Sequence, residues 1–414
     1  MRAYMALGRI GFCGVAAAVL AFACSNDNGS NVPPEAGVDS GTPGSGGKGG
    51  SGGASSGGKA GSGGGGTAGA AGSAAGAGGK VTMPEAGLPD GGDGGPAGLS
   101  LCGGMTGDDQ IKCGQYIVQS LDACGDCHTP RLQTGAPDTT KILAGNPAVF
   151  DLTNDPNDGM GNVPAPNLTT LKKDGWTSAE IVDAIQNGKV SAAHGGKGLF
   201  PFMPYVTFHN MALVDAQAIA AYLLSLTPIT NTIPAREPLG VPDSAFPVAP
   251  VNPGDIPDPV LDKSDPSYQD ALLGKYLAAE AGPCLDCHTE RLPDGTVDMA
   301  HPFAGGQTFA LGAPFGTVTS ANLTSDPKTG LKNWTPGLIE KLLHTGVNNN
   351  GDHICPPMPV GPNGAFGGLT DAHALAIGAY ITHLPPVANG DDAGGPFPLC
   401  LLPAMPDAGK DSGP

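Results

Sequence analysis

The pattern Cys-x-x-Cys-His occurs twice in the chain, as CGDCH beginning at Cys124 and as CLDCH beginning at Cys284. Two thiols separated by two residues can add across the two vinyl groups of one porphyrin. A histidine directly after the second thiol then lies beneath the ring and can bind its iron. Each pattern therefore predicts one covalently attached haem c, and the predicted attachment and iron-binding residues are Cys124, Cys127, His128, Cys284, Cys287 and His288.

Two other chemistries use cysteines at this spacing. One CxxC pair can form a redox-active dithiol, and two such pairs can together bind zinc. Neither explains why a histidine directly follows both pairs, or why a methionine lies further along after each of them. We therefore favour haem attachment over a dithiol and over zinc.

A second axial ligand for each iron must come from elsewhere in the chain. A thioether suits low-spin haem iron and raises its potential relative to a second histidine. Met203 and Met358 follow the two motifs at similar distances, and both have prolines nearby. We predict these two methionines as ligands, and the competing side chains are His194, His209, His344, His353 and Cys355.

The sequence around the two motifs is itself repeated. GQYIVQSLDACGDCHTPRL from Gly114 aligns without a gap with GKYLAAEAGPCLDCHTERL from Gly274. The only two tryptophans, Trp176 and Trp334, fall at equivalent places, and AIAAYLLSLTP is followed much later by AIGAYITHLPP. The same segments in the same order indicate a tandem repeat of one domain.

Each copy is predicted to be mostly helical. One helix leads into the CxxCH motif, a second follows the tryptophan, and the last carries apolar residues at helical spacing around Tyr222 or Tyr380. The middle helix of the first copy begins with a capping box, and that of the second begins with a threonine cap followed by proline. The predicted capping residues are Thr177 and Thr335, and the predicted helix stops are Gly188 and Gly346.

The first hundred residues do not have the composition of a packed domain. Residues 1–23 carry Arg2 and Arg9 before an apolar run, which predicts a signal peptide and an exported protein of the periplasm or cell envelope. LAFAC resembles a bacterial lipoprotein signal, so we expect a lipid anchor at Cys24, although Phe22 leaves ordinary cleavage as an alternative. Residues 25–100 are rich in Gly, Ala and Ser and predict a disordered tether.

Net charge and cysteine count restrict the partners and the covalent structure. The formal charge of −18 disfavours nucleic acid, because phosphate binding needs a positive surface, and it fits a basic redox partner. Of the ten cysteines, Cys13 lies in the predicted signal, Cys24 is the predicted lipid site and four belong to the motifs. In an exported chain the other four are candidates for disulfides. We expect Cys102–Cys113 and Cys355–Cys400, although sequence does not fix the connectivity.

These segments together resemble a known family. CGDCHTPRL, PNLT, GWT, FMPY and AYLLSL are similar to one cytochrome c domain, and CLDCHTERL, ANLT, NWT, PPMPV and AYITHLPP to another. They most resemble the c-type cytochromes that include the haem subunits of membrane-bound alcohol and gluconate dehydrogenases. The resemblance implies small helical bundles in which the first and last helices cross, so that Tyr116 meets the helix of Tyr222 and Tyr276 that of Tyr380. Those subunits usually carry three haem domains, whereas this chain has two motifs.

The expected organisation is a first cytochrome c domain over residues 101–228, a linker over 229–266, a second domain over 267–388 and a tail over 389–414. Six further residues recur at equivalent places in the two copies. They either contact haem propionates or serve the fold alone, as core or turn residues. These residues are Trp176, Trp334, Asn167, Asn322, Arg131 and Arg291.

A haem iron with both axial positions filled has no vacancy for a substrate, so it can only change its oxidation state. The leading hypothesis is therefore an anchored dihaem carrier that passes single electrons between a dehydrogenase, another cytochrome or a copper protein. The main alternative is a dihaem enzyme of the peroxidase or thiosulfate dehydrogenase type, with one iron open or bound by Cys355. A redox or gas sensor is a weaker third hypothesis.

Overall fold

The computed structural model describes residues 99–132, 136–151, 162–238, 242–312 and 316–389. The predicted signal peptide, Cys24, nearly all of the predicted tether and the tail beyond Asn389 lie outside these residues. The described part is mostly helical with two small sheets, which confirms the predicted class. Within it, no helix has both the length and the apolar character needed to cross a membrane.

The elements before residue 226 surround the first CxxCH motif. Helix α1 runs directly into the π-helical turn η1, and the motif itself forms the short helix α2. Strands β1 and β2 pair antiparallel, with Asn146 opposite Ala165. The bounds are α1 Gly107–Tyr116, η1 Ile117–Leu121, α2 Cys124–His128, β1 Asn146–Asp151, β2 Asn162–Ala165, η3 Leu168–Thr170, α3 Ser178–Asn187, η4 Ala192–His194, α4 Tyr205–Phe208 and α5 Leu213–Ser225.

The elements after residue 267 follow a similar order around the second motif. A helix again continues through a π-helical turn into the motif, and the following hairpin pairs Thr308 with Thr319. Two 3-10 turns, η5 Asp243–Ala245 and η6 Pro253–Asp255, lie between the two sets. The bounds are α6 Tyr268–Lys275, η7 Tyr276–Glu280, α7 Cys284–Cys287, β3 Thr308–Gly312, β4 Gly316–Thr319, α8 Pro336–Thr345, η8 Ala365–Gly368 and α9 Asp371–Ile381.

The predicted ends of the middle helices are confirmed. Thr177 caps α3 in a complete capping box with Glu180, and the Thr335 side chain accepts a hydrogen bond from the third residue of α8. Both helices end on a glycine in the left-handed region, at φ 63° for Gly188 and 70° for Gly346. Glycine adopts this conformation without the steric cost that a Cβ atom imposes.

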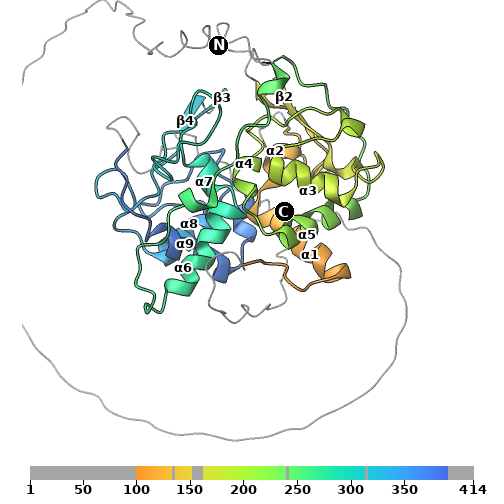
Figure 1. Ribbon diagram of the computed structural model, residues 1–414. Helices are drawn as coiled ribbons and strands as arrows, with labels where there is room; N and C mark the ends of the chain where they lie inside the picture. The colour runs from red at the N-terminus through yellow and green to blue at the C-terminus, as the bar shows by residue number, and fades with distance from the viewer. Residues whose placement is uncertain (1–98, 133–135, 152–161, 239–241, 313–315, 390–414) are drawn as a thin grey trace, which may run out of the picture. The chain divides into compact units, whose positions relative to one another are not determined.

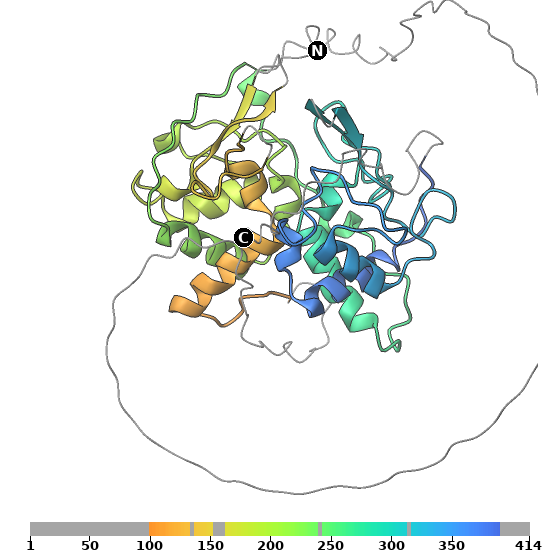
Figure 2. The ribbon, with the colours of Figure 1, turned by 180° about the vertical axis from the view of Figure 1, so that it is seen from behind.

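The helix crossing implied by the family resemblance is also present. Helix α1 lies beside α5, and α6 lies beside α9 (Figures 1 and 2). The backbones meet at Gly114 and Gly274, where an added methyl group would overlap the carbonyl oxygen of Ala218 or Ala376. Only glycine allows this approach, which explains its presence at the same position in both aligned segments.

We call the elements before residue 226 the first half and those after residue 267 the second half. A tyrosine of each half contacts the other half, which the sequence did not predict. The Tyr116 hydroxyl accepts a hydrogen bond from the Thr370 amide at 3.2 Å and lies 2.7 Å from His373 Nδ1, at the start of α9. The Tyr276 hydroxyl donates to Asp215 in the first turn of α5. Buried apolar side chains from both halves form one contiguous cluster. The two halves therefore share a core.

One of the two predicted disulfides is confirmed, and the pairing of the other stays a prediction. Cys102 and Cys113 are bonded, with Cα atoms 5.8 Å apart. The same segment is fixed by the Leu101 and Cys102 amides, which each donate to Asp215 at 2.8 Å. Cys355 is disulfide-bonded, and its predicted partner Cys400 lies outside the described residues.

The helix crossings give a first prediction. Gly114→Ala or Gly274→Ala should destabilise the protein by about 1–3 kcal/mol, because the methyl group must displace a helix backbone. Gly337→Ala in α8 is the matched control, since no heavy atom lies within 4 Å of the added carbon. It should be neutral or stabilising by up to about 1 kcal/mol. Denaturant unfolding measures all three, and equal stabilities would contradict the close packing.

The buried His373 gives a second prediction. Burial lowers the pKa of its imidazole to about 4, below the value of about 6.5 expected in the unfolded chain. The unfolded state therefore binds the proton first, so this stabilisation is complete above pH about 6.5 and is lost as the pH falls towards 4. His373→Gln should reduce the acid-induced loss of stability by at most about 3 kcal/mol. The expected reduction is smaller than this bound because the ring is partly exposed and water screens its charge. Unfolding at neutral and acid pH measures this, and equal losses in both proteins would refute it.

Candidate functional site

The two CxxCH motifs lie on short helices that present their cysteines together. In α2 and α7 the cysteines are three residues apart, which places both side chains on one face of the helix. All four thiols are free. This arrangement suits attachment of one porphyrin at each motif.

Both motif histidines are buried and held in one orientation. His128 is 7% exposed and its Nδ1 lies 2.8 Å from the carbonyl oxygen of Pro166. His288 is 8% exposed and its Nδ1 lies 2.8 Å from the carbonyl oxygen of Ala321. A carbonyl only accepts, so Nδ1 carries the proton and Nε2 keeps its lone pair. Burial lowers the pKa of both imidazoles, which favours the neutral ring that the predicted iron ligation through Nε2 requires.

The recurring asparagines fix those carbonyl groups. Asn167 directly follows Pro166, and its side-chain oxygen accepts from the Thr169 amide at 2.9 Å. Asn322 directly follows Ala321 and accepts from the Thr324 amide at the same distance. Their amide groups donate to backbone carbonyls after the last helices, Ile229 in one half and Val387 in the other. The structure thus supports the turn interpretation of these asparagines over propionate binding.

The thiols lack the lowered pKa that is expected of a redox dithiol. Burial raises the pKa of Cys127 to about 11 and that of Cys284 to about 12, so neither is a thiolate at neutral pH. A reactive dithiol needs a lowered pKa instead. Burial also raises the pKa of Cys287, and the neighbouring carboxylate of Asp286 adds to this effect.

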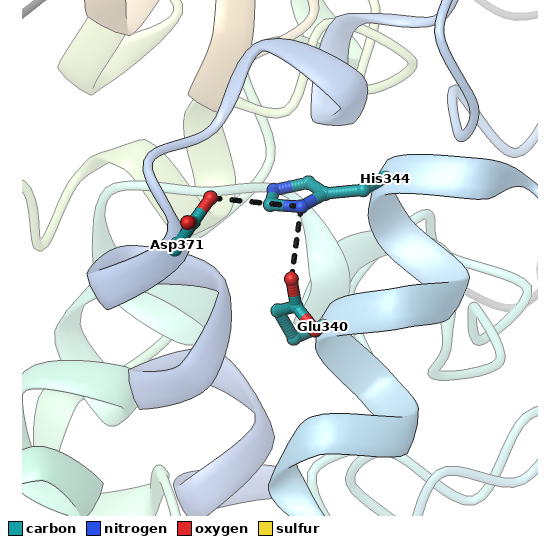
Figure 3. Close-up of side chains that lie close together, drawn as sticks. All are labelled: Glu340, His344 and Asp371. Carbon is teal, nitrogen blue, oxygen red and sulfur yellow. Dashed lines mark ion pairs between the residues drawn. The ribbon is translucent and has the colours of Figure 1, made fainter.

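The zinc alternative finds no support in the described part of the chain. Among the described residues, the motif cysteines do not form a group of three or more potential metal ligands close to one another. The group that does is Glu340, His344 and Asp371 (Figure 3). The His344 Nδ1 lies 3.1 Å from Glu340 and 3.9 Å from Asp371. A Glu–His pair one turn apart, with an aspartate at the start of the neighbouring helix, is an ordinary helix arrangement.

Met203 and Met358 occupy loops with the same backbone hydrogen bonds. The Met203 amide donates to Phe200 at 3.0 Å, and the Met358 amide donates to Cys355 at 3.2 Å. The carbonyl group of each methionine accepts from the residue two positions later. Both side chains are partly buried against the core cluster. Their role as axial ligands stays a prediction, now with equivalent local geometry in both halves.

Several competing ligands are engaged elsewhere. His194 stacks on Trp176, with ring centroids 4.3 Å apart and nearly parallel planes. His209 is exposed, and its Nδ1 lies 3.0 Å from the Gln186 carbonyl oxygen. His353 is also exposed. Because Cys355 is disulfide-bonded, it offers no thiolate to an iron, and this alternative to Met358 is disfavoured.

The recurring arginines lie beside aspartates of the motifs. Arg131 lies 3.7 Å from Asp126 in CGDCH, and Arg291 lies 2.5 Å from Asp286 in CLDCH. The first pair is partly exposed, whereas in the second Asp286 is buried and the Arg291 side chain is mostly buried. Of the two roles left open for these arginines, the ion pair of Arg291 with a protein carboxylate supports the structural one.

Sequence comparisons agree with this geometry. The chain is 27% identical over 298 residues to the cytochrome c subunit of a quinone alcohol dehydrogenase from Gluconacetobacter polyoxogenes, covering 67% of this chain and 56% of that one. Over 142 residues it is 37% identical to the gluconate 2-dehydrogenase cytochrome c subunit of Pantoea cypripedii, covering 33% and 29%. The chain resembles cytochrome c subunits of dehydrogenases. No protein-family model matches it.

Another relative is named as a diheme cytochrome. Over 110 residues the chain is 34% identical to a diheme cytochrome c-type protein of Cereibacter sphaeroides, covering 27% of this chain and 33% of that one. The aligned part of the chain spans only about half the length of the alcohol dehydrogenase subunit. These relatives imply covalently bound haem c as the cofactor of the motifs.

The asparagine turns give a third prediction. Asn322→Ala removes the acceptor of the buried Thr324 amide and one of the two donors to the Val387 carbonyl, which keeps the Thr324 hydroxyl, so it should cost about 1–3 kcal/mol. Asn349→Ala, at an exposed position, should change stability by less than about 0.5 kcal/mol. Chemical denaturation measures the stability of both variants. A loss of less than about 1 kcal/mol for Asn322→Ala would argue against a structural role of the Asn322 side chain.

Proposed function

We propose that the chain is a dihaem c-type cytochrome built from two tandem copies of one domain, over residues 101–228 and 267–388, and that it relays single electrons. The observation that carries this proposal is the pair of buried, neutral histidines beside free CxxC thiols, each oriented by a backbone carbonyl. The similarity to cytochrome c subunits supports it independently.

Each half supplies a complete set of residues for one haem. The two cysteines of each motif would hold the porphyrin, and His128 or His288 would bind the iron on one side. Met203 and Met358 would bind on the other side. The bound haem supplies reversible one-electron chemistry. With both axial positions filled, no vacancy remains for a substrate, which makes the chain a carrier rather than a catalyst.

The proposed partners follow from the relatives and from charge. The names of the relatives point to a dehydrogenase as the electron donor. A charge of −18 favours a basic surface on at least one partner, such as a copper protein or another cytochrome. We further propose export to the periplasm or cell envelope and a lipid anchor at Cys24, with residues 25–100 as a tether.

The rival proposal is a dihaem enzyme with one open iron. The disulfide at Cys355 counts against a thiosulfate dehydrogenase type with a cysteine ligand. A peroxidase type would instead need one iron without its methionine, and the equivalent loops around Met203 and Met358 count against that difference.

Carbon monoxide binding distinguishes the carrier from the enzyme. Protein made with haem-attachment machinery should contain two haems per chain, and its reduced visible spectrum should not change with carbon monoxide. Met203→Leu and Met358→Leu keep the side-chain volume but remove the ligand, so each should open one iron and shift about half of the signal. Met299→Leu is the matched control. A shift in the unmodified protein would overturn the carrier.

A further inference from the structure

The guanidinium group of Arg291 joins the two halves. It belongs to the segment just after the second motif, and its side chain is 11% exposed. It donates to the Gly295 carbonyl at 2.8 Å, to Asp286 within the motif at 2.5 Å, and to the Pro201 carbonyl of the first half at 2.8 Å. Three acceptors around one planar fork fix the side chain in a single orientation.

The contact partner in the first half is the loop that carries Met203. Pro201 lies two residues before the methionine, within the turn closed by the Met203 amide and the Phe200 carbonyl. Past the methionine, the Thr207 hydroxyl lies 3.4 Å from Asp286. The second motif thus contacts this loop on both sides of Met203, and helix α4 lies beside α7 (Figure 1).

Packing strengthens the contact. Gly295, whose carbonyl accepts from Arg291, has a φ of 85°. A methyl group added at Gly295 would lie 3.5 Å from the Pro201 ring. The second half therefore presents a close-fitting surface to the loop. The corresponding arginine of the first copy differs, because Arg131 is 44% exposed and lies 3.7 Å from Asp126.

We propose that Arg291 is a positioning residue for the first haem site, holding the Met203 loop in place from the second half of the chain. This inference rests on the proposed haem function. Loss of the guanidinium leaves the Pro201 carbonyl without its donor and Asp286 as a buried carboxylate without its cation. The loop then loses its support beside Met203, and the first iron loses the fixed position of its second ligand.

The test observes the methionine ligands directly. In the reduced protein, a methionine bound to haem iron gives a proton NMR methyl signal shifted far from its normal position by the ring current. Met203→Leu and Met358→Leu assign the two signals. Arg291→Gln should shift or abolish the Met203 signal and let carbon monoxide bind the first haem. Lys173→Gln, a control that removes one exposed positive charge outside the proposed sites, should leave both methionine signals in place and carbon monoxide excluded.

Arg291→Lys keeps the charge but cannot span all three acceptors, so it should displace the Met203 signal partially. If Arg291→Gln does not fold, Arg291→Lys still tests whether Arg291 positions the Met203 loop. An unchanged Met203 signal and continued exclusion of carbon monoxide in a folded Arg291 variant would overturn the inference. Absence of both methionine signals in the unmodified protein would instead overturn the proposed ligands, which keeps the two failures distinct.

Discussion

The hydrogen bond from each buried histidine to a backbone carbonyl is the interaction on which the proposed iron sites depend. It places the proton on Nδ1, and burial keeps the ring neutral, so Nε2 is the only atom left to bind a metal. The carbonyl is held in turn by an Asn–Leu–Thr turn, which is tied to the chain just after the last helix. Elements far apart in sequence therefore converge on the orientation of one imidazole ring.

The two halves are held together by specific side chains and not only by their connecting segment. Tyr116 and Tyr276 each reach the first turn of the last helix in the opposite half, and Arg291 reaches the Met203 loop. One hydrophobic cluster runs through both. For a relay this is an advantage, because a fixed relative position of the two motifs also fixes the path between two bound haems.

The features that were predicted from sequence are those set by local chemistry. The caps at Thr177 and Thr335, the stops at Gly188 and Gly346 and the disulfide of Cys102 all depend on residues close together in the chain. The contacts of Tyr116, Tyr276 and Arg291 with the opposite half were not predicted, because they depend on how two copies pack. No pattern within either copy contains that information. The role of the asparagines was left open for a related reason, since a turn and a propionate contact need the same residue type.

Equivalent residues of the two halves make different contacts where the halves meet. The CxxCH pattern and the helix-crossing glycines are the same in both, whereas Tyr276 contacts the carboxylate of Asp215 and Tyr116 contacts the imidazole of His373. Arginine is buried at one motif and partly exposed at the other. A buried charge acts strongly on its surroundings because little water screens it. Two haem sites with the same ligands would therefore experience different electrostatic environments, which two identical halves arranged symmetrically could not provide.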